Sequence, residues 1–360
     1  MKTSIARNHH FISQAEQRLN AIDATVKPRN QRIYNFEILQ RESPRIRKIK
    51  SAGVKIESNL ARMDLYALKV LEGAEQYNLE VAFQKYENDC SRITRTLLKN
   101  LKASKPESLK SELLRLYVLK LVNTIRNPYT IKRTLEMFRE LRGVLPGSET
   151  LQADFISFDC ASRPQVAKIC SEFGVSEDEY VSWLKVIFLL IMQPLGEGLN
   201  LIESLIKNLI ENTNVIKNFL IYRYDEGLEG RGVLLCDRMI DQRPLVGTQM
   251  QMFNLDATAF MVVILVDVKN QDFVSLTPED ASLDFRQGNL IHVDYAENNL
   301  EALKNFNQHC VWLANANVFC ASENPFGVDV EMQIPVEESL QNRFGSNLSS
   351  VDNEAANSGL

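Results

Sequence analysis

The stretch AFMVVILVDV, residues 259–268, decides the fold class, because its apolar and β-branched side chains are typical of a strand. NFLIYRYDEG at 218–227 and RGVLLCD at 231–237 have the same character, so the chain after about residue 215 is predicted to be rich in strands. Most of the chain from 57 to 214 instead spaces its apolar residues as a helix does. Helices that come first and strands that follow predict an α+β fold.

The helical part is divided by residues that begin and end helices. Pro106 can begin one helix and Pro128 stops it, while Ser176 and Glu179 form a capping box for a later one. The apolar spacing predicts helices over 74–101, 107–127, 130–145, 164–175, 176–192 and 199–212.

Shorter elements are predicted on either side of this region. A helix over 11–22, with Ser13 as its N-cap, precedes a strand over 32–38, and a helix over 294–316 precedes a last strand in NVFCASE at 317–323. The resulting organisation has four segments: a basic N-terminal arm with a helix and a short strand (1–56), a helical region (57–214), an α/β region completing the same fold (215–337) and a disordered Ser/Asn-rich tail (338–360).

The composition is that of a globular protein, with 360 residues of which 45% are hydrophobic and 24% charged. The most apolar stretch, VIFLLIM at 186–192, is too short to cross a bilayer and is predicted to be a buried helix. The N-terminus lacks the apolar segment of a secretory signal, and the six cysteines are scattered without a C-x-x-C pair. These features predict a cytoplasmic protein with reduced thiols and no membrane partner.

Charge is distributed unevenly, although the net charge is only −5. Residues 1–142 carry 28 Lys and Arg against 15 Asp and Glu, and the remainder carries 13 against 31, so the two parts hold +13 and −18. A basic half either binds a polyanion such as nucleic acid or attracts the acidic half of its own chain. Five basic residues of 41–50 could follow a phosphate backbone or lie on a solvated loop: Arg41, Arg45, Arg47, Lys48 and Lys50.

Two of the four histidines are adjacent, in NHHFISQ at 8–14. Neighbouring side chains point in different directions, so His9 and His10 are not expected to bind one metal together. One could act as a general base or metal ligand, as in the short histidine segment of metal-dependent nucleases, with Gln14 of the next helix nearby. The alternative is a structural pair. We predict that at least one packs against the core near Arg126 or Asp237.

Arg126 and Asp237 are the other main candidates. Arg126 lies at a predicted helix end, where its guanidinium can hold a carboxylate or phosphate. The structural alternatives are that it offsets the helix dipole or forms a buried ion pair with an acidic residue of the second half. Asp237 ends an apolar strand, a position used by functional carboxylates and by ordinary turn formers. His292 and Asp294 alternate in LIHVDY and share a strand face, which supplies two metal ligands without a third. A divalent metal is therefore an open expectation without an assigned site.

Several common signatures are missing from the sequence. It contains no G-x-x-x-x-G-K-[ST], G-x-G-x-x-G, G-x-S-x-G or H-E-x-x-H. Their absence argues against a P-loop nucleotidase, a common dinucleotide enzyme, an α/β hydrolase and a zincin.

Four short motifs resemble, in the same order, a bacterial domain-of-unknown-function family that opens with an HHYVPQ-like motif. The chain has HHFISQ at 9–14, RNP at 126–128, GVLLCDRMI at 232–240 for a strand ending in Ser-Asp-x-Pro, and an Asn-containing helix leading to a strand in FNQHCVWLANANVFCASE at 306–323. It departs from the family at Ser13, where proline is usual, at Cys236, where serine is usual, and after Asp237, where the proline is missing. The resemblance implies a setting in antiphage defence or mobile elements, and no mechanism.

The residues and the resemblance together favour a cytoplasmic bacterial effector, defensive or toxin-like, that acts on nucleic acid, with metal-assisted phosphodiester hydrolysis as the sharpest hypothesis. Two alternatives stay open. The chain could be a non-catalytic sensor that binds a phage or host protein, or a small-molecule enzyme that uses Arg126 and Asp237 in one pocket. The sequence does not predict an oligomeric state.

Overall fold

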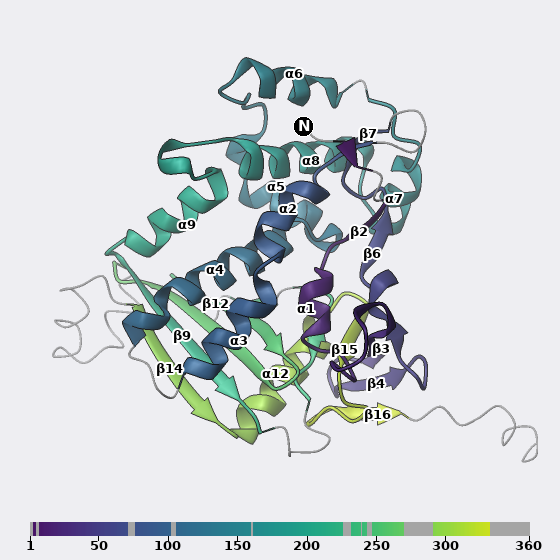
Figure 1. Ribbon diagram of the computed structural model, residues 1–360, viewed down its shortest axis with the longest axis vertical. Helices are drawn as coiled ribbons and strands as arrows, with labels where there is room; N and C mark the ends of the chain where they lie inside the picture. The colour runs from purple at the N-terminus through teal and green to yellow at the C-terminus, as the bar shows by residue number, and fades with distance from the viewer. Residues whose placement is uncertain are drawn as a thin grey trace, which may run out of the picture.

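The computed structural model has the α+β class that the sequence predicts, with helices dominating up to residue 211 and strands thereafter (Figure 1). The predicted tail at 338–360 and Cys160 lie outside the residues that it describes. These are residues 3–4, 7–70, 76–101, 106–159, 161–225, 232–238, 240–242, 247–269 and 291–331.

The centre of the molecule is a five-stranded mixed sheet. Its order is β11 (Ile240–Gln242), β12 (Thr248–Asp256), β13 (Ala259–Asp267), β9 (Val215–Arg223) and β14 (Ile291–Glu297), with only β14 and β9 parallel. Alternate side chains of β13 enter two cores: Met261 and Val263 pack on one side, and Phe260 and Val262 on the other. Burial on both faces explains why AFMVVILVDV is apolar throughout.

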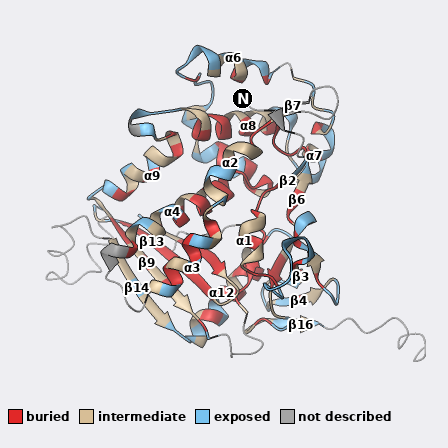
Figure 2. Ribbon diagram, in the orientation of Figure 1, coloured by how far each residue is buried: buried red, intermediate tan, exposed pale blue. Residues whose placement is uncertain are grey.

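Helices cover the Met261 side of this sheet. The aromatic ring of Tyr117, on a long central helix, meets Phe219 of β9 and Phe253 of β12 edge-on, each at 6.1 Å between ring centroids. Buried residues run from this contact through the helical layer (Figure 2). The helices are α2 (Glu80–Glu87), α3 (Cys90–Asn100), α4 (Pro106–Ile125), α5 (Ile131–Met137), α6 (Glu149–Ser157), α7 (Val166–Phe173), α8 (Glu177–Met192) and α9 (Leu201–Glu211).

The Phe260 side is covered by α12 (Leu300–Leu313), on which the ring of Phe306 stacks on Phe260 at 4.2 Å. Beyond it lies a six-stranded sheet in which β3 is paired with both β15 and β4, so the predicted N-terminal arm is integrated into the fold. Its strands are β10 (Leu235–Cys236), β15 (Asn317–Cys320), β3 (Arg32–Gln40), β4 (Arg45–Lys48), β16 (Asp329–Glu331) and β5 (Val54–Lys55).

The histidine pair lies on a short strand, β2 (Asn8–His10), that pairs antiparallel with β6 (Ala61–Met63). A small sheet of β1 (Thr3–Ser4), β8 (Gln76–Asn78) and β7 (Ala67–Val70) belongs to the same region. Strands β6, β7 and β8 contradict the prediction that the helical region begins at residue 57. Leu60 and Asp64 have positive φ angles of 51° and 56°, a conformation that no helix interior contains.

Several predicted helix bounds are wrong. The helix over 11–22 is only α1 (Gln14–Arg18), although Ser13 is its N-cap as expected. The segment predicted as one helix over 74–101 begins with strand β8 and continues as two helices, α2 and α3, which are separated by a turn at 88–89. The helix over 294–316 begins only at Leu300, because β14 continues to Glu297 and Asn299 is the N-cap. The helix over 130–145 ends at Met137, and α6 and β12 were not predicted.

Other expectations are confirmed. The Ser176–Glu179 capping box is formed, and the most apolar stretch is buried in α8. No described helix has both the length and the apolar character needed to cross a membrane.

Part of the basic half is neutralised by the acidic half. Among the described residues, the ion pairs that join the two parts include Arg47–Glu331, Lys48–Glu323, Arg62–Glu172 and Lys85–Glu203.

Candidate functional site

Arg126 occupies the residue after the last turn of α4, where the helix is stopped by Pro128. The last carbonyl groups of a helix have no hydrogen-bond donor within the helix. Here two buried aromatic side chains donate to two of these carbonyl groups. The Tyr66 hydroxyl donates to the Arg126 carbonyl at 2.8 Å, and Trp183 Nε1 donates to the Ile125 carbonyl at 2.8 Å. These bonds fix the backbone of Arg126 inside the core, and its side chain is 1% exposed.

The guanidinium of Arg126 is only partly satisfied. Its Cζ lies 4.7 Å from the ring centroid of Phe83, and Nη1 lies 2.5 Å from Oε1 of Glu87. That ion pair lacks the angles of a hydrogen bond, and Nε and Nη2 have no hydrogen-bond partner among the described residues. A buried cation with unused donors is costly, so such an arrangement calls for an explanation.

A second carboxyl group, Glu80, begins α2 and lies beside Arg126. Burial raises the pKa of Glu80 to about 7, against the opposing effect of Arg126 and with a further increase from Glu87. The backbone N–H of His10 donates to this carboxyl group, and Oε2 has no hydrogen-bond partner in the described chain. Glu80 can therefore give or accept a proton near neutral pH.

His10 faces the same group of charges. Burial lowers its pKa, the Glu57 carbonyl raises it and the charge of Arg126 lowers it again, so the ring is neutral at pH 7. Nε2 lies 3.2 Å from the Glu57 carbonyl oxygen, so the ring proton is placed on Nε2. Nδ1 is then a proton acceptor. We call His10, Glu80, Glu87 and Arg126 the Arg126 cluster.

His9 points to the face of β2 opposite His10, and its contacts are structural. It is fully buried, its Nδ1 accepts the backbone N–H of Tyr66 at 2.9 Å, and Nε2 lies 3.3 Å from Asn78 Nδ2. The ring also stacks on Tyr66, with centroids 5.6 Å apart. His9 therefore holds Tyr66, which in turn holds the Arg126 backbone, so the histidine pair and Arg126 lie together as expected.

Asp237 does not share a pocket with Arg126 among the described cavities. Its carboxylate accepts three backbone N–H groups, from Asn315 at 2.7 Å, Ala316 at 2.7 Å and Asn317 at 3.0 Å. Its carbonyl accepts from Asn127 Nδ2 at 2.7 Å. These bonds shape the turn between α12 and β15. Asp237 therefore has the contacts of a turn former, the alternative to a functional carboxylate.

The weaker candidates are dispersed. Gln14 accepts a hydrogen bond from Arg18 within α1. His292 and Asp294 share one face of β14 as expected, yet the described residues contain no group of three or more His, Cys, Asp or Glu that could hold a metal.

The basic stretch at 41–50 is largely engaged within the fold. Arg41 donates to the carbonyls of Val311, Trp312, Ala314 and Asn315 at the end of α12. Arg47 pairs with Glu37 and Lys48 with Glu323, while Arg45 and Lys50 are exposed. Only part of this stretch is therefore available to a phosphate backbone.

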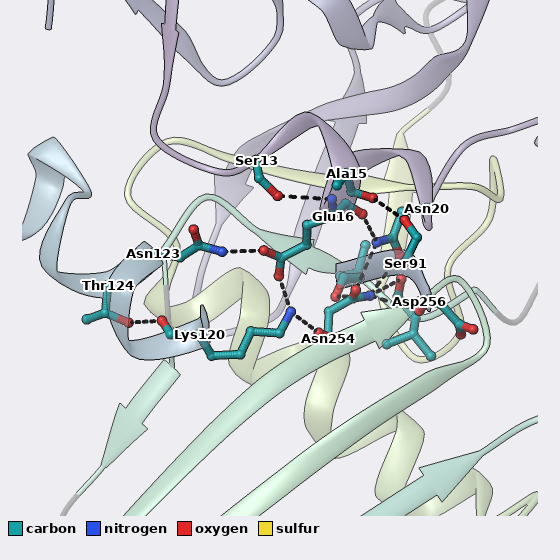
Figure 3. A network of polar contacts seen from close by, with 12 residues as sticks. Ser13, Ala15, Glu16, Asn20, Ser91, Lys120, Asn123, Thr124, Asn254 and Asp256 are labelled. Carbon is teal, nitrogen blue, oxygen red and sulfur yellow. Dashed lines mark hydrogen bonds and ion pairs between the residues drawn. The ribbon is translucent and has the colours of Figure 1, made fainter. Parts of the chain in front are cut away.

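A second buried polar group was not predicted from the sequence. Lys120 of α4 donates to Glu16 of α1 and, at 2.5 Å, to the Asn254 carbonyl, and Asn123 donates to the other oxygen of Glu16 (Figure 3). Asn20 and Asn254 exchange hydrogen bonds of 2.8 and 2.9 Å. We call these five residues the Glu16 network. Four of its members, Glu16, Lys120, Asn123 and Asn254, line a cavity of about 40 Å³, which is large enough to hold water.

A signal for this network is present in LLRLYVLKLVNTI at 113–125, where Lys120 and Asn123 interrupt an apolar helix. Their partners come from distant parts of the chain, which local spacing does not reveal.

Comparisons with protein-family models, curated proteins and solved structures found no match to this chain, so the resemblance to the HHYVPQ-like family rests on its motif residues alone.

Proposed function

We propose that this chain is a cytoplasmic phosphodiesterase that acts on nucleic acid, with the Arg126 cluster as its active site. One observation carries the proposal: a buried guanidinium with two unused donor nitrogens lies beside a carboxyl group whose pKa is about 7. A phosphate group presents oxygens that match the planar fork of arginine. Titratable groups with shifted pKa values are typical of catalytic sites.

The proposed reaction uses three side chains. Arg126 holds a phosphodiester through Nε and Nη2, and Nδ1 of the neutral His10 accepts a proton from the attacking water. The new P–O bond forms as the bond to the leaving oxygen breaks, and the protonated Glu80 gives its proton to that oxygen. Glu80 is then the acid and His10 the base. A divalent metal is not needed in this scheme, and the assay below tests its effect.

A phosphate is proposed to approach Arg126 from the side of Glu87. Its side chain is 20% exposed, whereas that of Arg126 is 1% exposed. A phosphate that supplies two aligned hydrogen bonds to Nε and Nη2 would compete with Glu87 for the guanidinium. The resemblance to the HHYVPQ-like family suggests a bacterial setting, such as antiphage defence, in which phage nucleic acid would be the substrate.

The test is hydrolysis of bis(p-nitrophenyl) phosphate and of a single-stranded DNA oligonucleotide, with EDTA or with Mg²⁺. Glu80→Gln and His10→Ala are each expected to lower kcat by about 100-fold or more, the usual contribution of a general acid or base. Glu136→Gln, an exposed carboxyl group of α5, is the matched control and should match the wild-type protein. Hydrolysis by Glu80→Gln at the wild-type rate, or no hydrolysis of either substrate by folded protein, would overturn the proposal.

A further inference from the structure

A large cleft lies apart from the Arg126 cluster, between α2, α3, α4 and α9. Its volume is about 510 Å³, within the range of about 300–1,000 Å³ that small-molecule sites occupy. In Figure 1, α9 lies alongside α4, and the two helices are in contact.

The floor of the cleft is apolar. Ile93 of α3 and Ile206 and Ile210 of α9 are buried there, and Leu114 and Val118 of α4 complete the surface. These branched side chains offer no hydrogen bond, so an occupant must present an apolar body to them.

The rim of the cleft is predominantly basic. Its basic residues are Lys85, Lys110, Arg115 and Lys207, against two acidic residues, Glu203 and Glu211. Lys85 pairs with Glu203 at 2.5 Å, and Arg115 pairs with Asp89 at 2.6 Å. Lys110 has no ion-pair or hydrogen-bond partner among the described residues.

Lys110 also interacts electrostatically with a buried lysine. Lys217 of β9 is fully buried, and its Nζ donates to the Asn212 carbonyl at 2.5 Å. Burial lowers the pKa of Lys217, and the positive charge of Lys110 lowers it further.

We propose that this cleft binds a single-chain amphipathic acid of the fatty-acid class, with its alkyl chain over Ile93, Ile206 and Ile210 and its carboxylate at Lys110. The shape and the charge support the same ligand: an apolar floor within a rim that has an excess of positive charge. This site is independent of the proposed phosphodiesterase activity and makes the chain a binder of a small molecule.

The experiment measures binding of monomeric dodecanoate and dodecanol to the full chain by calorimetry. Dodecanoate should bind at least about tenfold more tightly than dodecanol, the effect of one charge-assisted hydrogen bond. Lys110→Ala should remove that preference. Lys99→Ala, an exposed lysine of α3 outside the cleft, should retain it.

A variant that fills the cleft tests the position of the chain. Ile206→Trp should abolish binding of both compounds, and Val118→Trp is the second variant if the first does not fold. Equal binding of dodecanoate and dodecanol, an unchanged affinity in Lys110→Ala, or binding by both folded tryptophan variants would overturn the proposal.

Discussion

Two buried charged groups on the same stretch of chain, Lys120 and Arg126, differ in how completely they are satisfied. In the Glu16 network, the ammonium group and both oxygens of Glu16 have hydrogen-bond partners. In the Arg126 cluster, all three guanidinium nitrogens and one oxygen of Glu80 lack a hydrogen-bond partner among the described residues, and Nη1 has only its ion pair with Glu87. Both groups meet the desolvation cost of burial. In the Glu16 network the two opposite charges satisfy each other and only Asn123 Oδ1 lacks a partner among the described residues, whereas in the Arg126 cluster the charged groups themselves keep unused donors and acceptors. On this contrast we propose that the Glu16 network is structural and that the Arg126 cluster binds a ligand.

The largest expected effect on the free energy of unfolding comes from breaking the ion pair of the Glu16 network. Lys120→Met leaves Glu16 buried without its cation, which should lower the free energy of unfolding by about 3–5 kcal/mol. Urea denaturation at pH 7 measures this change. The double variant Glu16→Leu, Lys120→Met should regain much of the loss, since it removes the unpaired charge. A loss below about 1 kcal/mol in Lys120→Met would mean that the network contributes little.

Asp237 provides an intermediate effect. Asp237→Ala leaves three backbone N–H groups at 315–317 without their acceptor, which should cost about 2–3 kcal/mol. Phosphodiester hydrolysis by the folded variant should stay at the wild-type level, because the carboxylate lies outside the Arg126 cluster. Loss of hydrolysis in a variant of wild-type structure would instead place Asp237 in the active site.

Glu80 is expected to have a smaller effect on the free energy of unfolding, and this effect depends on pH. Its pKa of about 7 in the folded protein lies above the usual value of 4.5, so the folded state binds more protons between those values. Its contribution to stability is present at low pH and is lost as pH rises through about 7, by about 1–3 kcal/mol. Glu80→Gln stays neutral and should avoid that loss. His10, whose pKa is lowered, has the opposite dependence.

The measurement is the difference in unfolding free energy between Glu80→Gln and the wild-type protein at pH 5, 6, 7 and 8. Taking the difference removes most of the contribution of His10, which both proteins retain. The variant should gain stability relative to the wild-type protein as pH rises. A difference that does not change with pH would show an ordinary carboxyl group at this position.

The sequence predicted the fold class and most of the helices in the second half of the helical region, because capping residues such as Ser176 and long apolar spacing are local signals. It failed where tertiary pairing decides the backbone. The segment around β6 has helical spacing, yet Leu60 and Asp64 adopt positive φ angles and the strand pairs with β2.

The candidate site was predictable in part. His10 and Arg126 were recognised as unusual residue types at unusual positions, and they lie in one cluster. Glu80 and Glu87 were missed, since two carboxyl groups on one helix look like a solvated face until the fold buries them against Arg126. Asp237 was a candidate because the end of a strand suits both a functional carboxylate and a turn former. Only its three backbone N–H partners, which the sequence does not reveal, favour the turn former.

The most direct test of the contrast between the two groups is binding of inorganic phosphate, followed by NMR at constant ionic strength. Arg126→Lys keeps the charge but loses the planar fork, and Arg62→Lys makes the same change in a partly exposed ion pair. The wild-type protein and Arg62→Lys should bind phosphate alike, and Arg126→Lys should bind at least about tenfold more weakly, the loss of one charge-assisted hydrogen bond. Equal binding by Arg126→Lys, or no binding by the wild-type protein, would contradict the account and make the Arg126 cluster as structural as the Glu16 network.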